Sequence, residues 1–341
     1  MPILEGVRVK IWYDAGTGKQ VRYGVAIAKR LRAEGHEMIL TTRSHPDTLP
    51  LAESLGEKYV VVGRYNPKTL QTRLKNGTIR QLSFCKTFEK DAPDVAVSHG
   101  SVDQARVAFG LGKAIILTVD TPYADAVHRL TLPLSKYIVI SMAIPQKTIQ
   151  KYTVDAEIVS FDGVDEVAWV KGFQPRVKYD FGNPLIVVRQ FEKKAVYAKN
   201  ASVNMLALAK KLTQLGTVVF LSRYHRRPVK GLTVPTGFID SLSLVAQADL
   251  FVGGGGTITR EAALQGTPSI SVNVLKDQFV NDFLTEKGFP LFKAELPEVP
   301  KMAKKLLGSK KNTKHLAAQL ANPVDTIADL VNQIGEKTNV T

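Results

Sequence analysis

Residues 248–273 read ADLFVGGGGTITREAALQGTPSISVN, and this stretch decides the fold. Its pattern predicts a buried strand, a glycine loop, a helix over 257–265 and a second strand, because Gly266 and Pro268 end the helix. The four consecutive glycines at 253–256 leave backbone N–H groups that a ligand can approach closely. A helix N-terminus that follows such a loop suits a phosphate or a diphosphate.

The loop and its helix supply the first candidate binding residues. A diphosphate is predicted to contact Gly254, Gly255, Gly256 and Thr257, and Thr257 is also expected to cap the helix. Glu261 lies one turn further on the same helix face, so its carboxylate could accept the two hydroxyls of a ribose. A plain strand–helix turn with a solvated or ion-paired Glu261 is the alternative. The spacing is not the dinucleotide fingerprint, since no G-x-G-x-x-G follows a first strand.

The composition bounds the class of protein. The chain has 341 residues, 44% hydrophobic and 23% charged, which suits two globular domains that each bury a core. It shows no signal-peptide layout and no apolar run of the ~18 residues that a membrane span needs, so we expect a cytoplasmic protein. The single cysteine, Cys85, excludes an internal disulfide. A net charge of +15 indicates an anionic partner, but no nucleic-acid motif accompanies it.

Strand and helix patterns alternate along the chain, which predicts parallel sheets covered on both faces. The expected elements of the first half are strands at 7–13, 38–42, 59–62, 95–98, 114–119 and 137–140, a helix at 21–33, and a long basic helix within 67–90. In the second half they are strands at 185–188 and 218–221, helices at 202–215 and 242–247, and then the glycine stretch. We predict an N-terminal domain over 1–165, a linker over 166–182, a C-terminal domain over 183–322 and a terminal helix over 323–341.

Ligands of open parallel sheets bind outside the carboxyl ends of the strands, so polar residues there are candidates. In the first half these are Asp14, His99 and Asp120, each of which could take a proton from an acceptor hydroxyl. For His99, a satisfied structural histidine is the commoner explanation. Lys19, in DAGTGKQ, could meet a phosphate of the acceptor or stand exposed on a turn. The stretch fails the Walker A pattern, which excludes a P-loop ATPase.

In the second half Arg189 and Arg223 follow two predicted strands, where guanidinium groups could clamp a diphosphate. Gln278 and Asn281 are three residues apart at a predicted helix start, and could recognise sugar hydroxyls or cap the helix. The six histidines and one cysteine show no metal-ligand spacing. We therefore expect no metal and no cofactor, only a nucleotide sugar as co-substrate.

These segments resemble the donor-binding part of two-domain GT-B glycosyltransferases. Gly256, Thr259 and Glu261, followed by Gly266 and Pro268, match the pattern of the N-acetylglucosaminyltransferases that complete the lipid-linked precursor of peptidoglycan, and KDQFVNDFLTEKGF resembles their Gln-x-x-Asn segment. The chain is still more similar to a largely archaeal, uncharacterised family of predicted glycosyltransferases. That resemblance covers nearly the whole chain, through KIWYDAGTGK, SHGSVDQARVAFGLG, FDGVDE and VVR.

The resemblance implies a GT-B-like α/β fold of two Rossmann-like domains with parallel sheets that face each other across a cleft. It implies metal-independent transfer from a nucleotide sugar, expected to be a UDP-sugar, to an unknown acceptor that could be lipid-linked. Asp120, in ILTVDTPYADAVHRL, stands where the transferases carry a glutamate, and the last helix is expected to cross back to the first domain. Two alternatives stay open: a nucleotide-sugar 2-epimerase of the same fold, and a non-enzymatic basic protein that binds nucleotides or nucleic acid.

The densest basic run covers residues 301–314 and contains six lysines. A solvated helix face and loop is the preferred interpretation. The alternative is weak peripheral association with an anionic membrane, in which Met302, Leu306 and Leu307 share one helix face.

Overall fold

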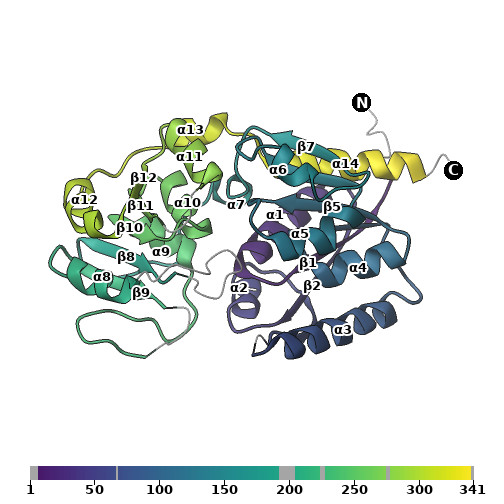
Figure 1. The fold of residues 1–341 in the computed structure, drawn as a ribbon, viewed down its shortest axis with the longest axis horizontal. Helices are drawn as coiled ribbons and strands as arrows, with labels where there is room; N and C mark the ends of the chain where they lie inside the picture. Colours follow the sequence, from purple (N-terminus) through teal and green to yellow (C-terminus); the bar gives the residue numbers. More distant parts are fainter. Residues whose placement is uncertain (1–6, 67, 192–203, 223–226, 274–276, 339–341) are drawn as a thin grey trace. The chain divides into compact units, whose positions relative to one another are not determined.

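The fold comes from a computed structural model that describes residues 7–66, 68–191, 204–222, 227–273 and 277–338. The chain forms two compact α/β units, one comprising Met1–Ala168 and Ala321–Thr341 and the other Trp169–Leu320 (Figure 1). Each unit is built on one sheet whose paired strands are all parallel. The prediction of two Rossmann-like domains is confirmed.

The first unit contains a seven-stranded sheet in the order β3-β2-β1-β4-β5-β6-β7. Its strands are β1 (Lys10–Ala15), β2 (Glu37–Ser44), β3 (Val60–Arg64), β4 (Val95–Ser98), β5 (Ala114–Val119), β6 (Tyr137–Ser141) and β7 (Glu157–Phe161). The sequence did not predict β7, an edge strand in which only Phe161 is fully buried. The strand order reverses between β1 and β4, and such a reversal is where open α/β sheets bind ligands.

Helices cover both faces of this sheet (Figure 1). On one face α1 (Gly18–Ala33) packs against α14 (Pro323–Thr338). On the other, α3 (Leu70–Thr87) packs against α4 (Val102–Gly110), and α4 against α5 (Asp125–Thr131). Helix α14 is tied to this unit by polar contacts as well: His36 Nε2 lies 2.9 Å from Asn332 Oδ1, and the Tyr137 hydroxyl donates to Gln333 Oε1 at 3.1 Å. The short helices are α2 (Thr48–Ser54) and α6 (Lys147–Gln150), and α7 (Val167–Val170) lies where the chain leaves the unit.

The second unit contains a five-stranded sheet in the order β12-β11-β10-β8-β9. Its strands are β8 (Leu185–Arg189), β9 (Thr217–Leu221), β10 (Leu250–Gly253), β11 (Ser269–Val272) and β12 (Leu291–Ala294), and the last of these was not predicted. Its helices are α8 (Met205–Leu212), α9 (Ser241–Gln247), α10 (Thr257–Leu264), α11 (Phe279–Glu286), α12 (Val299–Leu306) and α13 (Lys314–Gln319). Here the order reverses between β8 and β10. Within the predicted linker, Tyr179 and Phe181 pack against the core of this unit.

The structure buries the apolar side of the lysine-rich run. Leu306 is 7% exposed, and Met302 and Leu307 pack against the same core cluster of the second unit. Lys310 Nζ donates to the carbonyl oxygen of Ala248 at 3.3 Å, and burial lowers the pKa of this lysine. The apolar side chains of the run thus pack into the second unit, which favours the solvated interpretation of residues 301–314. Association of this run with a membrane stays a prediction. No helix in the described ranges is long and apolar enough to cross a membrane.

A buried ion pair joins the centre of the first sheet to α3. Arg80 donates to both carboxylate oxygens of Asp14, at 2.8 and 2.5 Å, and Asp14 also accepts from Thr41 Oγ1 at 2.7 Å and Ser101 Oγ at 2.5 Å. Asp14 is 1% exposed and Arg80 5%. Burial opposes the charge of the guanidinium, but the Asp14 carboxylate outweighs that effect and holds the pKa of Arg80 above its ordinary value. These bonds hold β1, β2, α3 and α4 together.

We expect Arg80→Met to destabilise the protein by about 3–5 kcal/mol, because it leaves the Asp14 carboxylate buried without its counter-charge. Arg73→Met is the matched control: Arg73 lies on the same helix but is exposed, so its loss should change stability by no more than about 0.5 kcal/mol. Urea unfolding curves of the two variants would measure the difference. Equal stabilities would show that the ion pair does not hold α3 on the sheet.

Candidate functional site

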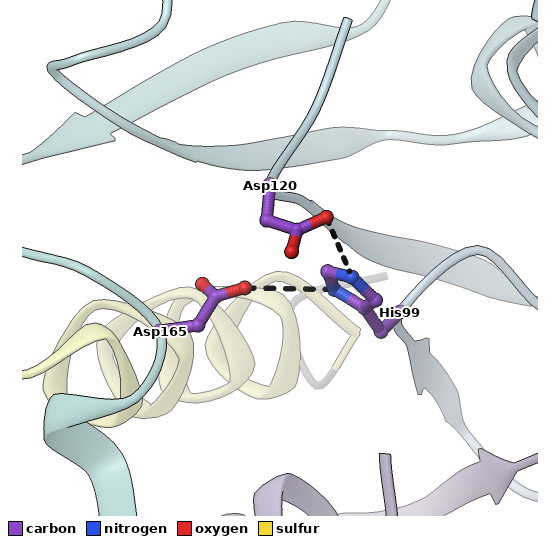
Figure 2. Close-up of side chains that lie close together, drawn as sticks. All are labelled: His99, Asp120 and Asp165. Carbon is purple, nitrogen blue, oxygen red and sulfur yellow. Dashed lines mark hydrogen bonds and ion pairs between the residues drawn. The ribbon is translucent and has the colours of Figure 1, made fainter. Parts of the chain in front are cut away.

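The carboxyl ends of three strands of the first unit bring His99, Asp120 and Asp165 together (Figure 2). They follow β4, β5 and β7 in turn, and one ligand-type atom from each lies within 4.8 Å of the others. His99 Nε2 lies 3.2 Å from Asp120 Oδ1, and His99 Nδ1 lies 3.8 Å from Asp165 Oδ2. The structure therefore unites two of the three predicted candidate bases, His99 and Asp120, with a carboxylate that the sequence reading did not single out.

Lys19 joins the three residues from the first turn of α1. Its Nζ donates to Asp120 Oδ2 at 2.6 Å and to Asp165 Oδ2 at 2.8 Å, and it lies 3.3 Å from His99 Nε2. The lysine side chain is 11% exposed. We call Lys19, His99, Asp120 and Asp165 the lysine–carboxylate cluster. Its ammonium is bound to two carboxylates, so the structure gives no support to the prediction that Lys19 meets a phosphate.

Hydrogen bonds from neighbouring strands and helices orient the cluster. His99 Nδ1 lies 2.6 Å from Thr118 Oγ1, whose hydroxyl can serve either tautomer of the ring. The Tyr23 hydroxyl donates to Asp165 Oδ1 at 3.4 Å. Burial and the Asp165 carboxylate raise the pKa of Tyr23 well above its ordinary value, so this hydroxyl keeps its proton.

Asp120 and Asp165 both bind the Lys19 ammonium, but they differ in their access to a ligand. Asp120 is the more accessible carboxylate, with 21% of its side chain exposed against 3% for Asp165. Asp120, next to His99, is therefore the group best placed to take a proton from a bound hydroxyl.

One histidine and two carboxylates are also a ligand set that divalent metals accept. The Lys19 ammonium, however, lies within hydrogen-bonding distance of both carboxylates, so a metal ion would have to displace it. The residues stand at positions 99, 120 and 165, and no ligand spacing in the sequence could indicate them. The expected absence of a metal stays a prediction.

Asp14, the third candidate base, does not join the cluster. Its carboxylate accepts four hydrogen bonds in the buried ion pair with Arg80 described above. The structure thus gives Asp14 a role in holding the sheet.

His128, in the segment that resembles the transferases, is buried on α5, and burial lowers its pKa to about 4, so it is neutral near pH 7.

In the second unit the glycine loop leads from β10 into α10 as predicted. Gly256 is its exposed residue and the N-cap of the helix, and Thr257 is the first helical residue. Among the described residues no side chain caps this end, and Thr257 follows the N-cap, so the prediction that Thr257 caps α10 is wrong. The backbone N–H groups of the first turn are thus the donors that an anion could meet beside Gly256.

Glu261 lies deeper in the unit than a solvated side chain would. It is 2% exposed, and its Oε1 accepts a hydrogen bond of 2.8 Å from Trp169 Nε1. Thr259 is also buried, at 1% exposed. The solvated alternative for Glu261 is therefore wrong, and its contact with a ribose stays a prediction.

The side chains of Gln278 and Asn281 lie against Gly255 of the glycine loop. Gln278 Oε1 accepts from Ser271 Oγ and from Asn281 Nδ2, both at 2.6 Å, and Asn281 Nδ2 lies 3.4 Å from the carbonyl oxygen of Gly255. Gln278 is the N-cap of α11 but makes no capping bond with its side chain. Among the described residues, Gln278 Nε2 and Asn281 Oδ1 are buried with no hydrogen-bond partner.

Arg189 is half-buried at the carboxyl end of β8, next to β10 and therefore at the reversal of strand order. Gly254, in the glycine loop between β10 and α10, packs against Phe191. Arg223, the other predicted clamp, lies outside the described residues.

A protein-family model described as "Protein of unknown function (DUF354)" matches residues 9–336. The uncharacterized protein MJ0665 of Methanocaldococcus jannaschii is 27% identical over 341 residues, which cover 95% of this chain and 98% of that protein. Among solved structures, the S. aureus MnaA–UDP complex matches with a TM-score of 0.69 at 14% identity, over 98% of each chain. The M. jannaschii UDP-GlcNAc 2-epimerase with UDP-GlcNAc and UDP matches at 0.67 and 15%, over 95% of this chain and 99% of that one. The glycotransferase of kitacinnamycin matches at 0.63 and 13%, over 96% and 99%.

Gly255 and Gly256 allow a matched test of the loop. Gly255 has a φ of +84°, and a Cβ there would collide with Gln278 and Ser271, whereas a Cβ on Gly256 would meet nothing within 4 Å. We expect Gly255→Ala to destabilise the protein by about 1–3 kcal/mol. Gly256→Ala should change stability by no more than about 0.5 kcal/mol. Chemical unfolding of both variants would check this, and a stable Gly255→Ala would mean that the loop adopts another backbone conformation.

Proposed function

The chain belongs to the family described as a protein of unknown function (DUF354), and we propose that it is a metal-independent glycosyltransferase. It would transfer the sugar of a nucleotide sugar, most simply a UDP-sugar, to a hydroxyl of an acceptor. The observation that carries this proposal is the lysine–carboxylate cluster, because a partly exposed carboxylate, Asp120, lies beside His99 at the carboxyl ends of the strands, where open α/β sheets bind ligands. The resemblance of the glycine stretch to donor-binding segments supports binding of the nucleotide sugar in the second unit.

In the first unit, Asp120 would accept the proton of the acceptor hydroxyl as that oxygen attacks the anomeric carbon. His99 contacts the same carboxylate through Nε2 and would share the proton. Lys19 binds Asp120 and Asp165 at once, and so would hold Asp120 in one orientation through the reaction. Asp165, almost fully buried, would keep Lys19 in place rather than touch the substrate.

In the second unit, the diphosphate would lie at the open N-terminus of α10, where Gly256 exposes backbone donors. Arg189 stands at the end of the neighbouring strand β8 and could pair with the same anion. These positive groups would stabilise the leaving diphosphate, which is the task that a metal ion has in other transferases. Glu261 would accept the ribose hydroxyls once the ligand is bound.

A 2-epimerase acting on a nucleotide sugar is the second candidate. Such an enzyme removes the diphosphate and returns it to the same sugar, so it needs more than one acid or base near the sugar ring. The closeness of Asp120 and Asp165 favours this candidate, because it brings two carboxylates to one site. Purified protein with a UDP-sugar and no acceptor decides between the two: interconversion of the sugar would indicate an epimerase, and its absence with slow release of UDP a transferase.

The donor half of the proposal predicts specific losses of binding. A thermal-shift screen of UDP-, GDP-, TDP- and CMP-sugars should show stabilisation by one nucleotide class, because a ligand of the native state raises stability by mass action. Glu261→Gln keeps an oxygen for Trp169 and should lower the affinity for that nucleotide sugar about tenfold, since charged hydrogen bonds are worth about 1.5–3 kcal/mol against 0.5–1.5 for neutral ones.

Glu286→Gln, an exposed change on α11, is the control and should bind as the wild type does. Calorimetric titration would measure both affinities. Unchanged affinity of Glu261→Gln would remove Glu261 from the binding site, and no stabilisation by any nucleotide sugar would contradict the proposed donor.

A further inference from the structure

Exposed apolar side chains of the described structure gather in one stretch of the first unit. Of the fourteen large apolar residues that are exposed, seven lie between residues 58 and 88: Val60, Val61, Tyr65, Leu70, Leu74, Ile79 and Leu82. The same 31 residues contain seven Lys or Arg residues and no Asp or Glu. Apolar exposure and positive charge therefore coincide.

Helix α3 carries the most exposed part of this stretch. We define its outer face by six residues: Leu70, Leu74, Lys75, Ile79, Leu82 and Lys86. At about 100° per residue, five of them fall within an arc of about 140°, and Leu70, in the first turn, lies about 40° beyond Leu74 at the edge of this arc. The four apolar members are between 49% and 80% exposed, and both lysines are exposed. Arg80 and Phe84 lie on the opposite side and are buried.

The inner side of α3 fixes the orientation of the helix. Arg80 is held by both oxygens of Asp14, and the Phe84 ring packs edge-on against Trp12 with centroids 4.6 Å apart. The helix cannot turn its leucines inward without breaking these contacts. Several exposed apolar side chains on such a fixed surface indicate an interaction site.

We propose that the outer face of α3 binds the surface of an anionic lipid bilayer. The leucines would enter the boundary between headgroups and acyl chains, and Lys75 and Lys86 would lie at the phosphates. The absence of acidic residues from the whole stretch makes it complementary to an anionic surface. This inference does not depend on the proposed function.

The chemistry of the face favours a bilayer over two other partners. Nucleic acid would pair with the lysines, but single strands are bound by stacking on aromatic rings, and the outer face offers aliphatic side chains. A second copy of this chain in a two-fold dimer would bring the same basic face against itself, and like charges would oppose each other. A bilayer accepts both the aliphatic and the cationic groups.

The first test compares two double variants of the full chain by co-sedimentation with vesicles. Leu74→Glu with Leu82→Glu changes the outer face. Met142→Glu with Val154→Glu is the matched control, since these residues are 61% and 72% exposed elsewhere in the same unit and the charge change is equal. On mixed phosphatidylcholine–phosphatidylglycerol vesicles we expect the outer-face variant to lose binding at least about tenfold, and the control to bind as the wild type does.

The second test separates the charge of this face from the net charge. Lys75→Gln with Lys86→Gln should weaken binding to the anionic vesicles by about fivefold for each lysine. Lys304→Gln with Lys305→Gln removes two exposed lysines of the lysine-rich run at residues 301–314 and should have a much smaller effect. Pure phosphatidylcholine vesicles, or high salt, should weaken binding of the wild type.

Several outcomes would overturn the inference. Equal sedimentation of the wild type and the Leu74→Glu, Leu82→Glu variant would do so, as would an equal loss in the matched control. A wild-type dimer in analytical ultracentrifugation that the same variant dissociates would assign the face to a second copy instead. Matching circular dichroism and melting temperatures of all variants would show that each is folded.

Discussion

The first unit depends on one shared cation. The Lys19 ammonium lies 2.6 Å from an oxygen of Asp120 and 2.8 Å from an oxygen of Asp165, and so allows two carboxylates to stand beside His99 at the edge of one sheet. Without it, like charges at this separation would repel each other in a partly buried place. The residues come from the ends of β4, β5 and β7 and from α1, so the parallel arrangement of the sheet is what makes the cluster possible.

Asp14 and Asp120 differ in burial and in hydrogen-bond partners, and so differ in the role that each suits. The Asp14 carboxylate accepts hydrogen bonds from both terminal nitrogens of the Arg80 guanidinium and from two hydroxyl groups, so its role is structural. Asp120 shares the Lys19 ammonium with Asp165 and keeps part of its surface exposed, which suits exchange of a proton with a ligand. The ion pair between Asp14 and Arg80 also holds α3 on the sheet. It therefore fixes which side of α3 faces outward.

The sequence was sufficient for elements with strong local signals and insufficient where distant residues meet. Alternating patterns and the glycine loop predicted two parallel α/β domains, and α10 begins and ends within one residue of its predicted bounds. Edge strand β7 buries too little apolar surface to show a pattern, so Asp165 behind it was passed over. Asp14 was a candidate base because its partner Arg80 stands 66 residues away, and no local pattern connects the two. The burial of Glu261 likewise depends on Trp169, 92 residues earlier.

The proposed function depends on Asp120 as the proton acceptor, held in place by Lys19, and on a transfer that needs no metal ion. The most direct measurement is release of UDP from the UDP-sugar that stabilises the protein best, by the wild type and by Asp120→Asn, each before and after chelation of divalent metals. The account predicts that chelation leaves wild-type turnover unchanged, and that Asp120→Asn lowers turnover by about 10²–10⁴ while the donor still binds. Turnover that is lost on chelation and restored by a divalent metal, or that survives Asp120→Asn, would contradict it.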